Sequence, residues 1–380
     1  MNRKEVGEIR RRIRPEHNNI SFICGCYVNA EKAVVSSFEE SVALMSAEER
    51  EKYFALLRKS LSGSLGRNLL QLDFATKEVM DSAEHKLLSA LRKSELRDAS
   101  LLESFYQTVI ANIDPGENGC LILLAMDKYD VPHYGKDGAE GDSGEVFRYL
   151  VCAVCPIKPG KAELGYDAQD KRFHSALQGS VAAAPELGFL YPAFDERAAN
   201  IYGALFYSRS VNEEHAAFID AVFRAPVPPS AGAQKESFAE LLSTSLEKDC
   251  SFAVVQSVHE QLHERMELHK ESKDPETLTL SPDELGDMLE NGGASPEEAE
   301  RFVSRCREKL GEEAQLIPAN IAPSRRMQIC TPQVKISVEP QFSHLVEARV
   351  LDGKKVLVIS AEAGVELNGL PVQIPGEKAE

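Results

Sequence analysis

The stretch CLILLAMDKYDV, residues 120–131, decides the fold class. It is a short apolar run, and a run of this length bounded by turn signals is typical of a buried strand. A turn precedes it, because Asp114-Pro115-Gly116 ends the helical pattern that comes before. The stretch therefore predicts a buried β-strand in the first part of the chain.

Strand patterns and helical patterns lie on both sides of this stretch. Residues 20–29 and 33–38 predict a hairpin, because β-branched and aromatic residues flank the turn-like Asn29-Ala30-Glu31-Lys32. Ser46 with Glu49 three residues later predicts the start of a helix. Further strands are expected in the sequences NLLQLDF, FRYLVCAVCPI, GFLYPAF and NIYGALFYS. Residues 1–224 are thus expected to form a mixed α/β domain with a basic N-terminal helix.

The rest of the chain changes character twice. Residues 225–234 are rich in proline and small residues and are expected to be a linker. Residues 235–326 are expected to be helical, with helices at about 236–247 and 252–271 and two more that begin with Ser-Pro-x-Glu at Ser281 and Ser295. Residues 327–380 are expected to be β-rich, since Asp352-Gly353 and Asn368-Gly369 favour hairpins. The expected fold class is α+β: a mixed sheet-and-helix domain, a helical segment and a hairpin-rich segment.

Composition and charge exclude several classes of protein. The chain has 380 residues, of which 43% are hydrophobic and 27% charged, and this is the composition of a globular protein. A net charge of −17 disfavours general DNA binding. No apolar run reaches the roughly 18 residues of a membrane span, and no apolar stretch follows the N-terminal charges as in a secretory signal. We therefore expect a cytoplasmic protein without membrane attachment.

The eight cysteines are scattered along the chain and lie mostly in apolar runs. This distribution predicts reduced, buried thiols that act as small hydrophobic side chains. A metal site built from Cys24, Cys26, Cys152 and Cys155 is the alternative. It is disfavoured because Cys152 and Cys155 would point to opposite faces of a strand.

The most direct sign of chemistry is HEQLHERMELH at residues 259–269. On a helix, His263 lies about 40° around the axis from His259, so both imidazoles could chelate one zinc ion. Glu260 lies at about 100°, where the general base of a zinc protease would be. A zinc-dependent hydrolase with ligands His259 and His263 and base Glu260 is therefore one candidate function.

The third histidine argues against that candidate. A helix that continues past His263 carries His269 well around the axis and two turns further along. Metzincin proteases reverse the chain with a glycine, which reaches backbone angles closed to other residues, whereas Met266 stands here. We therefore expect an uninterrupted helix and predict no catalytic residue, metal or cofactor, with zinc as the alternative.

The N-terminus offers a binding feature. Val6, Ile9 and Ile13 are spaced for one face of a helix, and the remaining faces carry cations. The predicted binding residues are Arg10, Arg11, Arg12 and Arg14. Residues 1–14 could bind RNA, a ribosome or an acidic protein partner. They could equally fold back onto the acidic body or form a solvated terminal helix.

Several stretches also resemble a known family over essentially the whole chain. The resemblance lies in KEVGEIRRRIRPEHNNI…GCYVN, LSGSLGRNL, APELGF with YPAFDERAANIY, VHEQLHE and KESKDPE. The family consists of uncharacterised bacterial proteins, mainly from anaerobic Firmicutes, and carries a domain-of-unknown-function label. The resemblance implies a bacterial cytoplasmic protein and brings no catalytic residue or cofactor with it. The expected function is a non-catalytic interaction or regulatory role, with the zinc hydrolase and an RNA- or ribosome-associated factor as alternatives.

Overall fold

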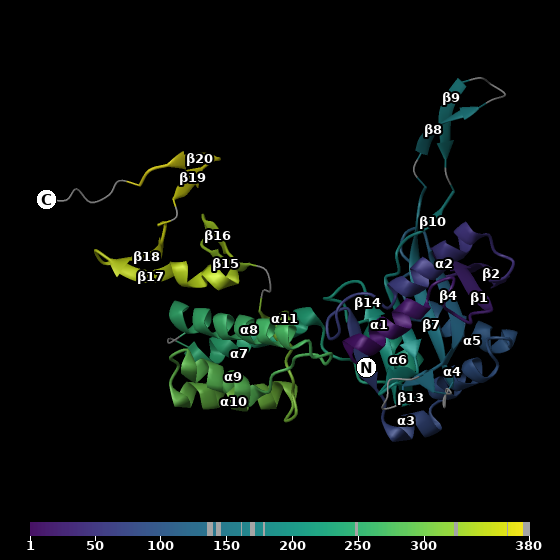
Figure 1. Cartoon of the computed structure of the whole chain (residues 1–380), viewed down its shortest axis with the longest axis horizontal. Coiled ribbons are helices and arrows are strands. Elements are labelled where there is room, and N and C mark those ends of the chain that lie inside the picture. Colours follow the sequence, from purple (N-terminus) through teal and green to yellow (C-terminus); the bar gives the residue numbers. More distant parts are fainter. Residues whose placement is uncertain are drawn as a thin grey trace. The chain divides into compact units, whose positions relative to one another are not determined.

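The structure is a computed structural model, and it has the expected α+β architecture (Figure 1). It describes residues 1–134, 140–141, 146–160, 162–167, 172–177, 179–247, 250–322, 326–362 and 364–374. The chain divides into two compact units. Unit 1 comprises Met1–Ala233 with Pro275–Thr277, and unit 2 comprises Gln234–Asp274 and Leu278–Glu380.

Unit 1 is built on one antiparallel sheet with the strand order β2-β1-β4-β7-β11-β14-β3. The strands are β1 (Phe22–Val28), β2 (Val34–Ser41), β3 (Leu69–Asp73), β4 (Cys120–Asp130), β7 (Val146–Lys158), β11 (Leu187–Tyr191) and β14 (Gly203–Ser208). The short β10 (Val181–Ala182) also pairs with β7. The predicted strand at residues 120–131 is β4, and it lies inside the sheet between β1 and β7.

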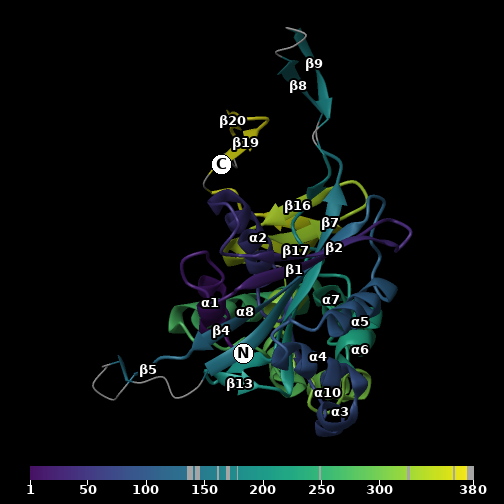
Figure 2. The ribbon, with the colours of Figure 1, turned by 90° about the vertical axis from the view of Figure 1, so that its right-hand side faces the viewer.

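The two faces of this sheet bury separate hydrophobic cores. Helices cover both faces of the sheet (Figure 2). Side chains alternate along β4, so that Ile122 and Leu124 belong to one core and Leu123 and Ala125 to the other. The first core is covered by α3 (Thr76–Asp81), α4 (Ala83–Lys93), α5 (Ala99–Ala111) and α6 (Ala216–Phe223). The second is covered by α1 (Arg3–Arg12), α2 (Ala47–Lys59) and the hairpin of β12 (Ala193–Asp195) and β13 (Ala198–Asn200).

Two further hairpins extend from unit 1. They are β5 (His133–Tyr134) with β6 (Glu140–Gly141), and β8 (Ala162–Asp167) with β9 (Arg172–Leu177). The predicted hairpin at residues 20–38 is formed by β1 and β2, and Asn29 closes its turn by accepting the backbone N–H of Ala33.

Unit 2 begins as a group of helices around a third core. The helices are α7 (Ala231–Leu246), α8 (Phe252–Ser272), α9 (Pro282–Asn291), α10 (Pro296–Leu310) and α11 (Pro318–Ile321). The capping boxes predicted at Ser281 and Ser295 are both present. Helix α7 begins earlier than expected, because the hydroxyl of Ser230 accepts the N–H of Ala233 and caps a segment of small residues that resembled a loop.

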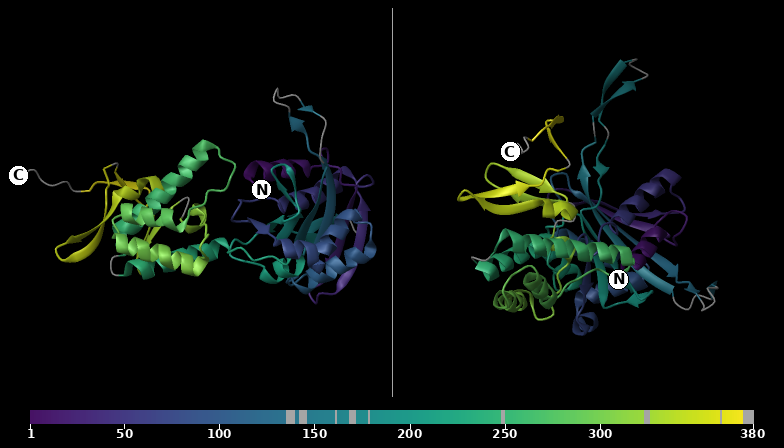
Figure 3. Two further views of the ribbon diagram at one scale, coloured as in Figure 1. Left: turned by 90° about the horizontal axis from the view of Figure 1, so that it is seen from below. Right: turned by 60° about the vertical axis from the view of Figure 1, so that its left-hand side comes forward.

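The C-terminal part of unit 2 consists of hairpins, as predicted. Its elements are β15 (Met327–Cys330), β16 (Lys335–Val338), the 3₁₀ helix η2 (Pro340–Leu345), β17 (Val346–Leu351), β18 (Lys354–Ile359), β19 (Val365–Leu367) and β20 (Leu370–Val372). Asp352-Gly353 and Asn368-Gly369 form the two turns with positive φ at all four residues. Figure 3 shows the yellow hairpin of β17 and β18 beside the green helices of the same unit. Among the described residues, no helix combines the length and apolar composition that crossing a bilayer requires.

Candidate functional sites on α8 and α1

Helix α8 carries the three histidines and continues without interruption from Phe252 to Ser272. Ser251 caps its N-terminus by accepting the N–H of Val254 at 3.2 Å. The helix passes straight through Met266, as the absence of a glycine led us to expect, so the chain does not reverse between His263 and His269. His259 and His263 therefore share a face of the helix, and His269 does not join them.

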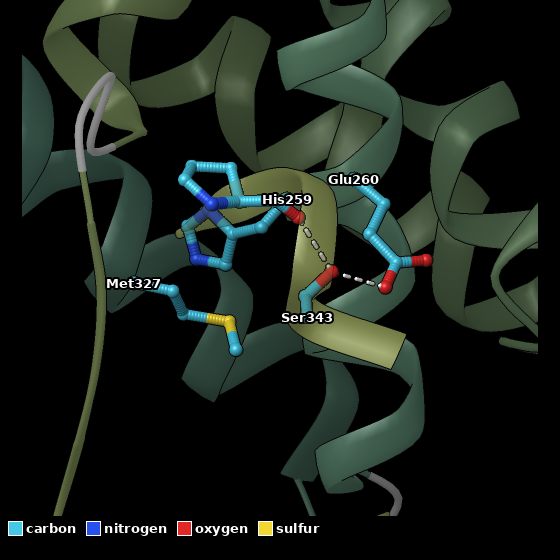
Figure 4. Close-up of a pocket in the computed structure, with 5 residues that line it drawn as sticks. His259, Glu260, Met327 and Ser343 are labelled. Carbon is cyan, nitrogen blue, oxygen red and sulfur yellow. Dashed lines mark hydrogen bonds between the residues drawn. The ribbon is translucent and has the colours of Figure 1, made fainter. Parts of the chain in front are cut away.

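A small pocket lies where α8 meets η2 and β15 (Figure 4). It is lined by His259, Glu260, Met327, Pro340 and Ser343. Its volume of about 10 Å³ is enough for one water molecule and not for a peptide or an ester substrate. Among the described residues, His259 and Glu260 thus lie at an internal contact of unit 2.

Glu260 is engaged at this contact. The hydroxyl of Ser343 lies 2.6 Å from Oε1 of Glu260 and 2.8 Å from the carbonyl oxygen of Pro340. A serine hydroxyl donates one proton, and a hydrogen bond to an ionised carboxylate is the stronger of two such options. The carboxylate that the zinc interpretation needs as a general base therefore accepts a hydrogen bond from the η2 helix.

Gln256 reinforces the same contact from one turn earlier on α8. Its amide nitrogen donates to the carbonyl oxygen of Ser343 at 2.7 Å and lies 3.4 Å from that of Val346. Residues four apart lie on one face of a helix, so Gln256 and Glu260 hold η2 together. No signal in the sequence marked Gln256 or Ser343, because their partners are far away along the chain.

The electrostatic surroundings of His259 favour the neutral imidazole. Burial lowers the pKa of His259, and the nearby positive charge of Lys235 lowers it further. Its Nδ1 is buried and makes no hydrogen bond with any residue that the structure describes. His263 is only half-buried. Across the described part of the chain, no three His, Cys, Asp or Glu side chains are grouped to hold a metal ion.

The cysteines of unit 1 lie inside the sheet as expected. Cys24, Cys26, Cys120 and Cys152 are buried in the first core, and Cys155 points into the second. Burial raises the pKa of Cys26 to about 11 and is the main cause that raises the pKa of Cys24 to about 12. Thiols with such pKa values stay protonated near neutral pH, and a protonated thiol is a poor nucleophile.

Helix α1 is anchored to the sheet through its apolar face and one arginine. Val6, Ile9 and Ile13 are buried in the second core. The Nε of Arg12 lies 3.1 Å from Oδ2 of Asp127, which is fully buried, and the guanidinium carbon lies 4.2 Å from the centre of the Tyr129 ring. The N-terminal segment is therefore folded onto unit 1.

The carboxylate of Asp127 has a complete set of donors. Besides Arg12, it accepts the hydroxyl of Tyr149 at 2.8 Å and the backbone N–H groups of Asn19 at 2.7 Å and Lys128 at 2.9 Å. The sequence contained one signal for this site, since a charge inside an apolar strand requires a partner. It did not reveal that the partner would be Arg12.

The other predicted arginines face outward. Arg10, Arg11 and Arg14 are exposed, as are Arg3 and Lys4. At 100° per residue, the four cations within α1 other than Arg12 span about 120° of its circumference, and Arg12 lies outside that arc, about 80° beyond Lys4. None of the five exposed cations forms an ion pair with a residue that the structure describes. We call Arg3, Lys4, Arg10 and Arg11 of α1, together with Arg14 two residues after its end, the basic face of α1.

The fold and these sites define an α+β protein with a helix-covered antiparallel sheet, a helical and hairpin-rich second unit, and a basic face on its first helix. Residues 1–370 match the family described as Domain of unknown function (DUF4317), and the chain belongs to that family. No curated protein and no solved structure matches the chain. The resemblance found in the sequence is thereby confirmed.

Proposed function

We propose that the protein is a non-catalytic binding protein that engages RNA through the basic face of α1. The observation that carries this proposal is that one arginine of this segment is paired with a buried carboxylate while its neighbours face solvent. Arg12 is committed to the buried Asp127, while Arg10, Arg11 and Arg14 are exposed and have no ion-pair partner in the described part of the chain. A cluster of cations on one helix face is the electrostatic footprint of a nucleic-acid-binding protein.

The anchoring of α1 supports binding by a preformed surface. The helix buries Val6 and Ile9, and its N-terminus has a capping box in which Asn2 and Glu5 bond to each other's backbone. Cations on an ordered helix lose less conformational entropy on binding than cations on a disordered tail. The five side chains would therefore approach a ligand together.

Phosphate is a better match for this face than protein carboxylate. Four of the five cations are arginines, whose planar guanidinium groups donate two parallel hydrogen bonds to a phosphate. The net charge of −17 repels nucleic acid from the rest of the chain, so contact would be confined to α1. The proposal places the protein in a compartment that contains RNA, which for a bacterial protein is the cytoplasm.

Fluorescence anisotropy with a labelled single-stranded RNA of mixed sequence tests the proposal. If the basic face makes five phosphate contacts, the logarithm of the binding constant should fall with the logarithm of salt concentration with a slope of about −3.5. The triple variant Arg10→Ala, Arg11→Ala, Arg14→Ala should bind at least tenfold more weakly and reduce that slope to about −1.4.

The matched control removes the same charge from unit 2 with Arg349→Ala, Lys354→Ala and Lys355→Ala, all exposed on the β17–β18 hairpin. This control should bind RNA like the unchanged protein. Equal losses in both triple variants, or no RNA binding at low salt, would overturn the proposal. Retention on polyglutamate without binding to RNA would assign the basic face to an acidic protein partner instead.

A further inference from the structure

Strand β2 is an open edge of the unit 1 sheet, since β1 is its one neighbour in the strand order. The N–H of Val42 donates to the carbonyl oxygen of Ser21 at 3.0 Å, which makes these two residues a hydrogen-bonded pair. Hydrogen-bonded pairs recur at every second residue of an antiparallel ladder, so the backbone groups of Glu40 and Phe38 also bond to β1. Ser37 and Glu39 therefore turn their backbone N–H and C=O groups away from the sheet.

A groove runs beside this edge, between β2 and helix α5. Its volume is about 490 Å³, within the range of ligand pockets in proteins. Val34, Ser37 and Glu39 line it from the strand, and Leu102, Glu103 and Tyr106 line it from the helix. The side chains of Ser37 and Glu39 lie on the same face of the sheet as those of their cross-strand partners, Cys26 and Cys24, which is the face that α5 covers. The unpaired backbone groups of these two residues therefore lie at the border of the groove.

The groove has the chemistry of a site for a basic peptide. Its described lining contains the carboxylates of Glu39 and Glu103 and no lysine or arginine. Glu39 is paired with Arg97 at 2.6 Å, whereas Glu103 forms no ion pair with a described residue. Apolar surface is exposed next to these charges, since Val34 and Val35 are 43% and 55% exposed.

We propose that β2 binds an extended peptide carrying lysine or arginine, which adds to the sheet as a further strand and places alternate side chains in the groove. Main-chain hydrogen bonds to Ser37 and Glu39 would hold the peptide, as in other cases of strand addition to a sheet edge. Glu103 would select a positively charged side chain. A second copy of the protein is a poor occupant, because pairing β2 with itself brings like charges at Glu39 and Glu40 close together.

The first test is binding of a fluorescein-labelled peptide of alternating valine and lysine, followed by anisotropy. Glu103→Lys should weaken binding at least tenfold, whereas Glu117→Lys, an equal charge change at an exposed residue in the turn before β4, should leave it unchanged. The triple variant of the basic face should also bind this peptide normally, which separates the edge site from the RNA proposal.

The second test concerns the backbone hydrogen bonds. Ser37→Pro removes an outward-facing N–H, which an edge strand tolerates, and it should abolish peptide binding without loss of helical circular dichroism. A probe peptide with every second amide N-methylated tests the same bonds on unchanged protein and should not bind. Undiminished binding of the N-methylated peptide, equal effects of Glu103→Lys and Glu117→Lys, or self-association through β2 in place of peptide binding would overturn the proposal.

Discussion

The side chain of Arg12 makes a 3.1 Å ion pair with Asp127, and the aspartate is completely buried while the arginine is 18% exposed. This pair links the N-terminal helix α1 to strand β4, which lies inside the sheet between β1 and β7. It separates one arginine of α1, which stabilises the fold, from the neighbouring arginines that face outward.

Replacing Arg12 by leucine should destabilise the protein by about 3–5 kcal/mol, because a buried carboxylate loses its cation. Urea unfolding followed by circular dichroism measures this loss as a lower midpoint. Arg11→Leu is the matched control, and an exposed residue of this kind should change stability by less than about 0.5 kcal/mol. Equal midpoints for the two variants would show that the Arg12–Asp127 pair contributes nothing to the fold.

Replacing Glu260 by alanine should loosen the contact between α8 and η2. Ser343 loses its charged acceptor and keeps the carbonyl of Pro340, so we expect a cost of about 1–2 kcal/mol that is confined to this contact. Hydrogen exchange should accelerate at residues 343–346 and not in unit 1. Glu264→Ala, an exposed position on the same helix, should leave the exchange pattern unaltered.

Metal analysis tests whether His259 and His263 bind zinc. Protein purified without a histidine tag should contain well under one equivalent of zinc, since α8 supplies two histidines and the chain does not turn back to bring in a third. His259→Ala should leave that content unchanged. One full equivalent that disappears in His259→Ala would establish a zinc site and revive the hydrolase hypothesis.

Acidification should destabilise unit 1 through His85. Burial lowers the pKa of His85, and the hydrogen bond between its Nε2 and the carbonyl of Phe223 only partly opposes this effect. The folded state then binds fewer protons than the unfolded state below about pH 6.5, so stability falls as the pH falls through that value. His215, whose pKa burial also lowers, acts on unit 1 in the same direction. Burial likewise lowers the pKa of His259, which lies in unit 2.

Urea midpoints at pH 7.5 and about 5.5 measure this dependence. His85→Gln keeps a donor for the Phe223 carbonyl and does not titrate, so its midpoint should change less between the two pH values. If the urea midpoint of His85→Gln fell between the two pH values by as much as that of the unchanged protein, protonation of His85 would not limit stability in acid.

The parts of the structure that the sequence predicted are those decided by neighbouring residues. The capping boxes at Ser281 and Ser295 and the turns at Asp352-Gly353 and Asn368-Gly369 each depend on a few adjacent side chains. The same holds for the unbroken helix through Met266, because helix propensity is local. These elements could be located without any tertiary information.

The parts that escaped prediction depend on residues far apart in the chain. Strand β3 at residues 69–73 pairs with β14 at residues 203–207, and no local pattern specifies that partner. Ser343 meets Glu260 across 83 positions, and Arg12 meets Asp127 across 115. Such contacts follow from how complete elements pack, which hydrophobic periodicity does not encode.

The buried aspartate has one more consequence, for the alignment of β4. From Ile122 to Met126 this strand is apolar on both faces, so a slip by one residue would still place hydrophobic side chains in both cores. The slip would, however, turn Asp127 away from Arg12 and Tyr149 and bury its charge among the apolar side chains of the opposite core. A single carboxylate therefore fixes which face of β4 points toward which core. An insertion or deletion anywhere between Cys120 and Asp127 should accordingly be far less tolerated than a substitution there.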